Sequence, residues 1–203
     1  ALGGAGHSQT VDFGSGNLSV TGGSSGGRSF ASVYSGGSQT ISGLGDIVLS
    51  GGVLPNAGSP ATLNTSSGQV TDPVVYSWAE ISASSGQDIT ARSISVNAAA
   101  GSSSTFIFDA NGLQKISTTG GEGGNPSAFG LTVRNLGATG TDQNGFLANA
   151  SITTKSGQQV IDVANSAGIQ ILGDGGQAII NAGQLFPGVI DAQGVSQSIT
   201  VHG

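Results

Sequence analysis

A short Gly/Ser-rich junction, followed by a glutamine and then by β-branched residues, recurs along the 203-residue chain. The glutamines of this pattern are Gln9, Gln39, Gln69, Gln87, Gln114, Gln158 and Gln197. The first three are spaced by 30 residues, and self-similarity at a period of this size is typical of stacked repeat folds. The repeat therefore constrains the fold more than any other feature of the sequence.

Each repeat divides into up to three short strands that are separated by Gly-rich turns. The first strands are expected at 10–13, 40–42, 88–91 and 160–163, the second at 18–21, 47–49, 94–96 and 169–172, and the third at 30–34, 62–65, 105–108 and 146–153. Three strands and three turns in about 30 residues have the size of one coil of a β-helix. We predict an all-β chain, a single right-handed parallel β-helix (β-solenoid) domain over 1–203 with about six irregular coils.

Apolar residues alternate with polar residues in the predicted strands, as in VDF (11–13), LSV (18–20) and IQI (169–171). Because successive side chains of a strand point to opposite faces, the apolar set should face one interior. The residues expected to be buried in columns are Val11, Leu18, Val20, Ile41, Ile47, Leu49, Ile89, Ile94, Val96, Ile169 and Ile171.

The glutamine spacings of 30, 30, 18, 27, 44 and 39 residues show that the coils are uneven. The spacing of 18 predicts a truncated coil, and a short helix around 75–81 is an alternative for part of that stretch. The longest spacings predict a loop insertion around 120–150, with Gly-rich segments at 120–130 and 138–145. Long loops on a compact scaffold are often functional.

The junction glutamines predict a ladder of side-chain amides along the solenoid axis. Stacked coils place equivalent residues about 4.8 Å apart, and each amide has both donors and an acceptor for its neighbours. The alternative is a set of exposed polar turn residues without a ladder.

Composition excludes several classes of function. Only 8% of the residues are charged, the net charge is −6, and the five basic residues are scattered, so nucleic-acid binding is not expected. No apolar run is long enough for a membrane span, and the absence of cysteine excludes disulfides. We expect no cofactor. Calcium is a weaker alternative at TDQNG (141–145) and GDGG (173–176), where turn formation alone explains Asp and Asn beside Gly.

The carboxylates do not cluster in the sequence as a catalytic pair would require, and no two of them lie within two residues of each other. We therefore expect that the protein is not an enzyme. Trp78, Tyr76 and Tyr34 could stack on sugars, although packing against the solenoid is the more frequent role of such residues.

Segments SQTISGLGDIVLSGG (38–52) and GQDITARSISVNAAAG (86–101) follow a loose G-x-Q-x-I, I-x-V/L, G-G pattern. In this respect the chain resembles the filamentous-haemagglutinin-like β-helical repeats of large bacterial secreted adhesins. The resemblance covers most of the chain and implies a secreted protein, extracellular or at the cell surface. The arrays of that family are far longer, so the short array leaves two alternatives, a fragment of an adhesin or a small subunit that builds a fibre.

Neither end of the predicted solenoid has a capping helix, and SQTVDF (8–13) resembles SQSITV (196–201). Uncapped ends that stack head to tail generate filaments. The sequence therefore predicts a self-assembling structural protein of a surface or biofilm-matrix fibre, with an interface formed by Gln9, Val11, Phe13, Gln197, Ile199 and Val201. The alternatives are an adhesin segment that binds glycans or another surface through the insertion and, more weakly, a polysaccharide-degrading β-helix enzyme.

Overall fold

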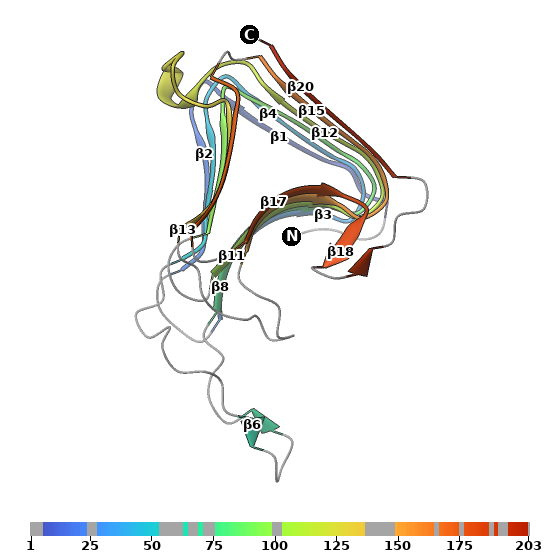
Figure 1. Cartoon of the computed structure of the whole chain (residues 1–203). Coiled ribbons are helices and arrows are strands. Elements are labelled where there is room, and N and C mark those ends of the chain that lie inside the picture. The colour runs from blue at the N-terminus through green and yellow to red at the C-terminus, as the bar shows by residue number, and fades with distance from the viewer. Residues whose placement is uncertain are drawn as a thin grey trace.

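The protein forms a parallel β-helix whose three sheets make the sides of a triangle (Figure 1). The computed structural model describes residues 6–23, 28–52, 63–64, 69–70, 76–98, 103–136, 149–164, 167–174, 177–186, 189–190 and 195–202. Within this part of the chain, no helix is long and apolar enough to cross a membrane.

The three sheets are named sheet A, sheet B and sheet C in the order in which the chain visits them. Sheet A contains β1 (Gln9–Gly14), β4 (Gln39–Gly43), β9 (Gln87–Ala91), β12 (Gly112–Thr118), β15 (Gly157–Val163) and β20 (Ser196–Val201). Sheet B contains β2 (Leu18–Thr21), β5 (Ile47–Ser50), β10 (Ile94–Ala98), β13 (Leu131–Leu136) and β16 (Ile169–Asp174). Sheet C contains β3 (Arg28–Ser35), β8 (Tyr76–Ala83), β11 (Ser103–Asp109), β14 (Asn149–Thr154) and β17 (Gln177–Ala182).

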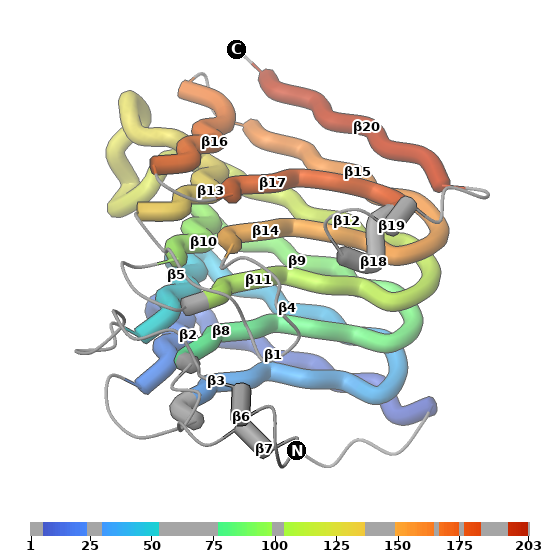
Figure 2. The backbone as a smooth tube through the Cα atoms, turned by 60° about the horizontal axis from the view of Figure 1, so that its bottom comes forward, coloured from blue at the N-terminus to red at the C-terminus, as the bar shows by residue number. Residues whose placement is uncertain are grey.

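Successive coils stack in register from the N-terminal end to the C-terminal end (Figure 2). All neighbouring strands of the three sheets pair in parallel, with Ile41, Ile89, Ile116, Ile161 and Ile199 in one column of sheet A. The strands make five complete coils, and β20 begins a sixth in sheet A. The predicted parallel β-helix is confirmed, whereas its handedness stays a prediction.

The remaining described elements lie outside the three sheets. They are the 3-10 turn η1 (Glu122–Gly124), the antiparallel pair β6 (Leu63–Asn64) and β7 (Gln69–Val70), and the antiparallel pair β18 (Gln184–Phe186) and β19 (Val189–Ile190). The segment 120–130 of the predicted insertion is described, whereas all of 138–145, including TDQNG (141–145), lies outside the described residues.

The second coil differs from the sequence prediction. Gln69 lies in β7 and begins no coil, so the predicted truncated coil does not exist. The third strand of the second coil is β8, and neither the predicted strand at 62–65 nor a helix around 75–81 takes that place. Ala79 and Ile81 are fully buried at alternate positions of β8, which is the period of a strand rather than of a helix.

Two further differences concern the fourth and fifth coils. Strands β12 and β13 occupy stretches to which the sequence analysis assigned no strand. In the fifth coil the residue above Gln114 is Gln159, whereas Gln158 pairs with Leu113. The inward-facing glutamine is therefore the second of the pair and not the first.

The core is a continuous stack of aliphatic side chains inside the three sheets. Seven of the eleven residues predicted as core are buried, namely Val20, Ile41, Ile47, Leu49, Ile89, Ile94 and Val96. Val11, Leu18 and Ile169 are half-buried, and Ile171 is 52% exposed, because they belong to the outermost rows. The predicted faces are right, but burial also depends on whether another coil covers the residue.

Candidate assembly interface

A ladder of glutamine side chains runs along the inside of sheet A. Each Nε2 group donates to the Oε1 atom of the preceding coil, over distances of 2.7, 2.8, 3.0, 2.7 and 2.5 Å. The members are Gln9, Gln39, Gln87, Gln114, Gln159 and Gln197. The predicted ladder is therefore confirmed, with Gln159 in place of Gln158 and without Gln69.

The ladder has one direction because the amide nitrogens are also bound to backbone carbonyls. Gln39 Nε2 donates to Val33 O at 3.1 Å, and Gln114 Nε2 donates to Thr153 O at 3.1 Å. A carbonyl oxygen only accepts, so these contacts fix which atom of each amide is the nitrogen. These bonds also tie sheet C to sheet A at the corner where the chain passes between them.

Both ends of the ladder are open within the described part of the chain. Gln9 Oε1 accepts from Gln39, and its Nε2 group has no partner among the described residues. Gln197 Nε2 donates to Gln159, and its Oε1 atom likewise has no partner there. The N-terminal end of the solenoid thus presents an amide donor, and the C-terminal end presents an amide acceptor.

The six predicted interface residues lie at opposite ends of sheet A. Gln9, Val11 and Phe13 are on β1, the first row, and the other three are on β20, the last row. Side chains Val11 and Phe13 are half-buried and pack against the core. Ile199 and Val201 are 45% and 46% exposed, although Ile161 and Val163 directly below them are fully buried.

The backbone N–H groups show which edges of β1 and β20, the two outer rows of sheet A, have no neighbouring strand. The N–H groups of Gln9 and Gln39 donate toward the C-terminal end, to Ser38 O and Gly86 O. His202 N–H donates back to Val163 O. Because backbone groups alternate sides along a strand, the N–H groups of Gln197, Ile199 and Val201 point to the uncovered edge of β20.

Sheet A extends one row beyond the other two sheets at the C-terminal end. Sheet A has six rows, and sheets B and C have five each. In consequence no described strand covers β16 or β17 at this end, and Ile171 of β16 is exposed together with β20. Sequence reasoning missed Ile169, Ile171 and Ile180 as end residues, although the same alternation would have identified them once the coils were counted.

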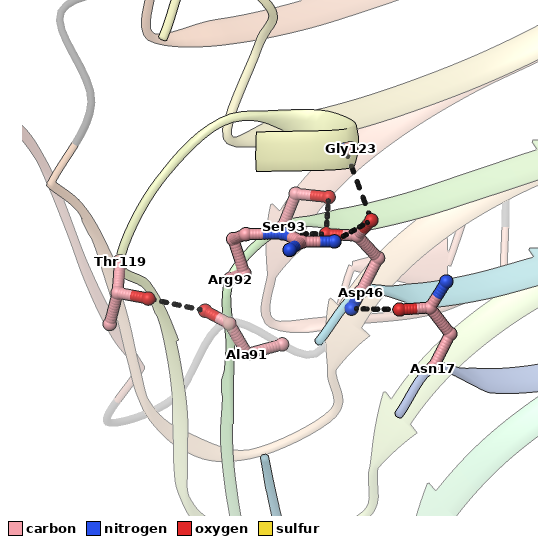
Figure 3. Close-up of polar contacts among 7 residues, drawn as sticks. All are labelled: Asn17, Asp46, Ala91, Arg92, Ser93, Thr119 and Gly123. Carbon is pink, nitrogen blue, oxygen red and sulfur yellow. Dashed lines mark hydrogen bonds and ion pairs between the residues drawn. The ribbon is translucent and has the colours of Figure 1, made fainter. Parts of the chain in front are cut away.

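An ion pair that the sequence did not reveal, between the buried Asp46 and the partly exposed Arg92, lies at the corner between sheets A and B (Figure 3). Asp46 accepts two hydrogen bonds from Arg92, at 2.8 and 2.6 Å, and one from the Ser93 hydroxyl at 2.9 Å. It also accepts from the Gly123 N–H at 3.1 Å, and its own N–H donates to Asn17 Oδ1 at 2.9 Å. The carboxylate joins the second coil to the third coil and to the segment 119–130 of the fourth, and the backbone N–H of Asp46 adds a bond to the first coil.

The electrostatics of Asp46 follow from these contacts. The Arg92 guanidinium holds the pKa of Asp46 below its ordinary value, burial opposes this, and Gly123 and Ser93 add to the lowering. All four contacts come from protein groups, so the geometry describes an anchor for the segment 119–130. No single residue pattern in the sequence signals it, because Asp46 and Arg92 are brought together only by stacking of two coils.

The other candidate residues give no assembled chemical site. Trp78 stacks on Phe30 with ring centroids 4.7 Å apart, Tyr34 lies at hydrogen-bond distance from Ser84, and the side chain of Tyr76 lies outside the described residues. Among the described residues, no three His, Asp or Glu side chains gather as metal ligands, and Asp174 of the GDGG segment is exposed. No family model, curated protein or solved structure matches the chain.

Proposed function

We propose that the chain is an extracellular structural protein that stacks head to tail into a surface or matrix fibre. The glutamine ladder, open as a donor at one end and as an acceptor at the other, is the observation that carries this proposal. The extracellular location rests on the resemblance of 38–52 and 86–101 to repeats of secreted adhesins.

At the proposed junction β1 of one copy pairs with β20 of the next in the register that the coils already use. Gln9 lies above Gln197, and its free Nε2 group donates to the free Oε1 atom, so the ladder continues without a change of direction. Val11 covers Ile199, whereas the bulge of β1 between Asp12 and Gly14 takes Phe13 out of the register that the coils share. The junction removes these half-exposed aliphatic side chains from water, at about 25 cal/mol per Å² of apolar surface.

Backbone groups support the same register. The N–H of Ile199 points to the uncovered edge of β20, so in parallel pairing it donates to the carbonyl of Thr10 of the next copy. This adds main-chain bonds to the side-chain contacts and satisfies groups that otherwise need water. Non-closing contacts between different ends of identical subunits generate filaments.

The row count adds one geometric condition. A copy stacked on β20 leaves one row open in sheet B and one in sheet C. Strand β16 is then about 10 Å from β2 of the next copy, and β17 is about 10 Å from its β3, instead of the usual spacing of about 5 Å. In the coil order, the missing row of sheet B follows β20, and the missing row of sheet C precedes β1 of the next copy. The junction is therefore continuous along sheet A and has one open row in each of the other two sheets.

The register is testable because the chain contains no cysteine of its own. Thr10 and Ser198 face outward in the same column of sheet A. In the stacked fibre their Cα atoms lie about 5 Å apart across the junction, which suits a disulfide. We expect a Thr10→Cys, Ser198→Cys variant to form covalent multimers on oxidation. The matched control, Thr10→Cys with Thr200→Cys, places the thiols two residues out of register, about 8 Å apart, and should not cross-link.

A second variant separates assembly from folding. Ile199→Pro removes an N–H group that faces the uncovered edge, so it should block filaments and leave the pairing of β20 with β15 in place. Negative-stain electron microscopy and thermal unfolding measure the two effects. Dispersed short rods of the wild-type protein, or equal cross-linking of both cysteine pairs, would overturn the stacking model, and dispersed rods would favour the adhesin alternative.

A further inference from the structure

One column at the corner between sheets C and A contains a carboxyl group among small residues. The column consists of Ser35, Ala83, Asp109, Thr154 and Ala182. Asp109 is the last residue of β11 and is fully buried. A buried acid in a stack of small and hydroxyl side chains calls for a local explanation, since an uncompensated buried charge is costly.

The hydroxyl groups of this column donate to carbonyls of the turn that follows. Ser35 Oγ donates to Ser38 O at 2.9 Å, and Thr154 Oγ1 donates to Ser156 O at 3.1 Å. The turn after Asp109 has the same length as the turn after Thr154, because Gly112 pairs with Gly157 and both have positive φ. Asn111 O is therefore the equivalent of Ser156 O.

The carboxyl of Asp109 is only half satisfied. Its Oδ1 atom accepts from the Gly86 N–H at 2.9 Å, whereas its Oδ2 atom is buried and has no hydrogen-bond partner among the described residues. An ionised carboxylate only accepts, so it cannot make the donor contact that Ser35 and Thr154 make in their coils. A protonated carboxyl has one O–H group and can make it.

We propose that Asp109 is a pH-sensitive clamp, which holds the corner between β11 and β12 in its protonated form by donating to Asn111 O and loosens that corner when it ionises. Ala83 below and Thr154 above carry no charge that would stabilise the ionised form. The clamp lies in the middle coil of the described solenoid, so it acts on the rod and not on its ends.

Charged groups on the surrounding elements do not neutralise Asp109. Glu80 of β8 points outward from sheet C, where the Ser32 hydroxyl donates to it, and Lys115 of β12 points outward from sheet A beside Asp88. The Lys155 backbone N–H donates to Asp109 O, and among the described residues no ion pair joins Lys155 to the carboxyl. Burial raises the pKa of Asp109 to about 6, and the nearby backbone N–H groups of Gly86, Asn111 and Ala110 only partly oppose this. Of these three groups, only the Gly86 N–H makes a hydrogen bond to the carboxyl, because the Ala110 N–H donates to Ala83 O and that of Asn111 lies near without such a bond.

The sign of the effect follows from the raised pKa. An acid with a folded-state pKa of about 6 and an ordinary value of 3.8 stabilises the fold fully below 3.8 and loses that contribution as the pH rises through 6. The unfolding equilibrium constant should rise about a hundredfold over the whole titration, and about 25-fold between about pH 4.5 and about pH 7.5. Asp46, whose pKa is lowered, acts in the opposite direction and below this window.

The test compares wild-type protein with Asp109→Asn, whose amide donates to Asn111 O at every pH, and with Asp109→Thr, which copies Thr154. We expect the thermal midpoint of the wild type to fall between about pH 4.5 and about pH 7.5, and the midpoints of both variants to change less. Because His7 and His202 are present in all three proteins, the difference between the curves isolates Asp109.

A direct measurement on the wild type does not depend on whether the variants fold. The carboxyl carbon of Asp109, followed by NMR, should titrate near pH 6. The amide protons of Gly86 and Leu113 should lose protection from exchange, corrected for intrinsic rates, over the same range. Parallel midpoint curves for wild type and Asp109→Asn, or a carboxyl that titrates at its ordinary value, would overturn the clamp.

Discussion

Replacing Gln87 in the middle of the ladder should destabilise the fold more than replacing a glutamine at its end. Gln87 is 2% exposed, donates to Gln39 at 2.8 Å and accepts from Gln114 at 3.0 Å. Methionine has nearly the same length and shape, so Gln87→Met removes the hydrogen bonds with little change in volume. The variant leaves Gln39 Oε1 without its donor and one proton of Gln114 Nε2 without its acceptor.

The magnitude follows from the burial of these two orphaned groups. Gln39 and Gln114 are 2% and 0% exposed, and an unsatisfied buried polar group costs about 1–3 kcal/mol, so the loss should be about 2–6 kcal/mol. Gln197→Met at the exposed end leaves only one group, Gln159 Oε1, without its partner, so it should cost about 1–3 kcal/mol, half the loss expected for Gln87→Met. Adding Gln39→Met to Gln87→Met replaces the unpaired Gln39 Oε1 by Gln9 Oε1 and also removes the donor to Val33 O. The bond between Gln39 and Gln87 is lost only once, so the double variant should cost less than the sum of its parts.

Denaturant unfolding in the Ile199→Pro background measures these differences without a contribution from assembly. The slope of the unfolding free energy against denaturant should stay constant, since the coils remain folded in every variant. Equal losses for Gln87→Met and Gln197→Met, or strict additivity in the double variant, would show that the ladder is present but contributes no cooperative stability.

Two other predictions concern the core and the corner anchor. Ile94 is fully buried between Ile47 and Leu131, so Ile94→Asp should lower the free energy of unfolding by about 3–5 kcal/mol. Ile171→Asp lies in the last row of sheet B and should cost much less, and equal thermal midpoints of the two variants would contradict the assigned faces. Arg92→Met should release the segment 119–130 and accelerate its cleavage in limited proteolysis, whereas Lys115→Met, which breaks only an exposed contact of 3.9 Å, should not; equal cleavage rates would contradict the anchor.

The fold could be predicted from the sequence because the features that specify it lie within short segments of the chain. Alternation of apolar and polar residues sets the inward face of a strand such as β4 or β10, and Gly-rich turns set where each strand ends. The glutamine ladder follows from the same pattern, since one residue type at one place in each coil is stacked by the fold itself. These features need no knowledge of which segments pair.

The sequence-based predictions were wrong where the pairing of distant segments determines which residues form a coil. Gln69 has the same local neighbourhood as the ladder glutamines, yet β8 and not the segment before Gln69 completes the second coil. Gln158 and Gln159 are equally suitable by local pattern. Gly157 lies directly on Gly112, where a Cβ atom would come within 2.0 Å of the Gly112 carbonyl, and this close approach selects the register that turns Gln159 inward.

The polar groups of the corners could not be predicted for the same reason. Asp46 and Arg92 are 46 residues apart, and Asp109 accepts from Gly86 in the preceding coil. The sequence shows only isolated acids before or within Gly-rich turns, where turn formation is the simplest explanation. Their burial, and therefore their effect on stability, exists only once the coils are stacked.

Position along the axis, more than residue type, determines what a side chain does in this fold. Ile161 and Ile199 occupy one column and differ by a single row, yet the first is fully buried and the second is 45% exposed. Because no described coil lies above β20, the side-chain oxygen of Gln197 and a row of backbone N–H groups of β20 also have no partners among the described residues. The last row of the solenoid thus has the same residue pattern as the interior rows but lacks a covering strand. The strand that would pair best with it has the same apolar–polar alternation and the same inward-facing glutamine. Among the described strands, β1 has both and no described strand covers its opposite side, which is why we propose a second copy of this chain as the partner.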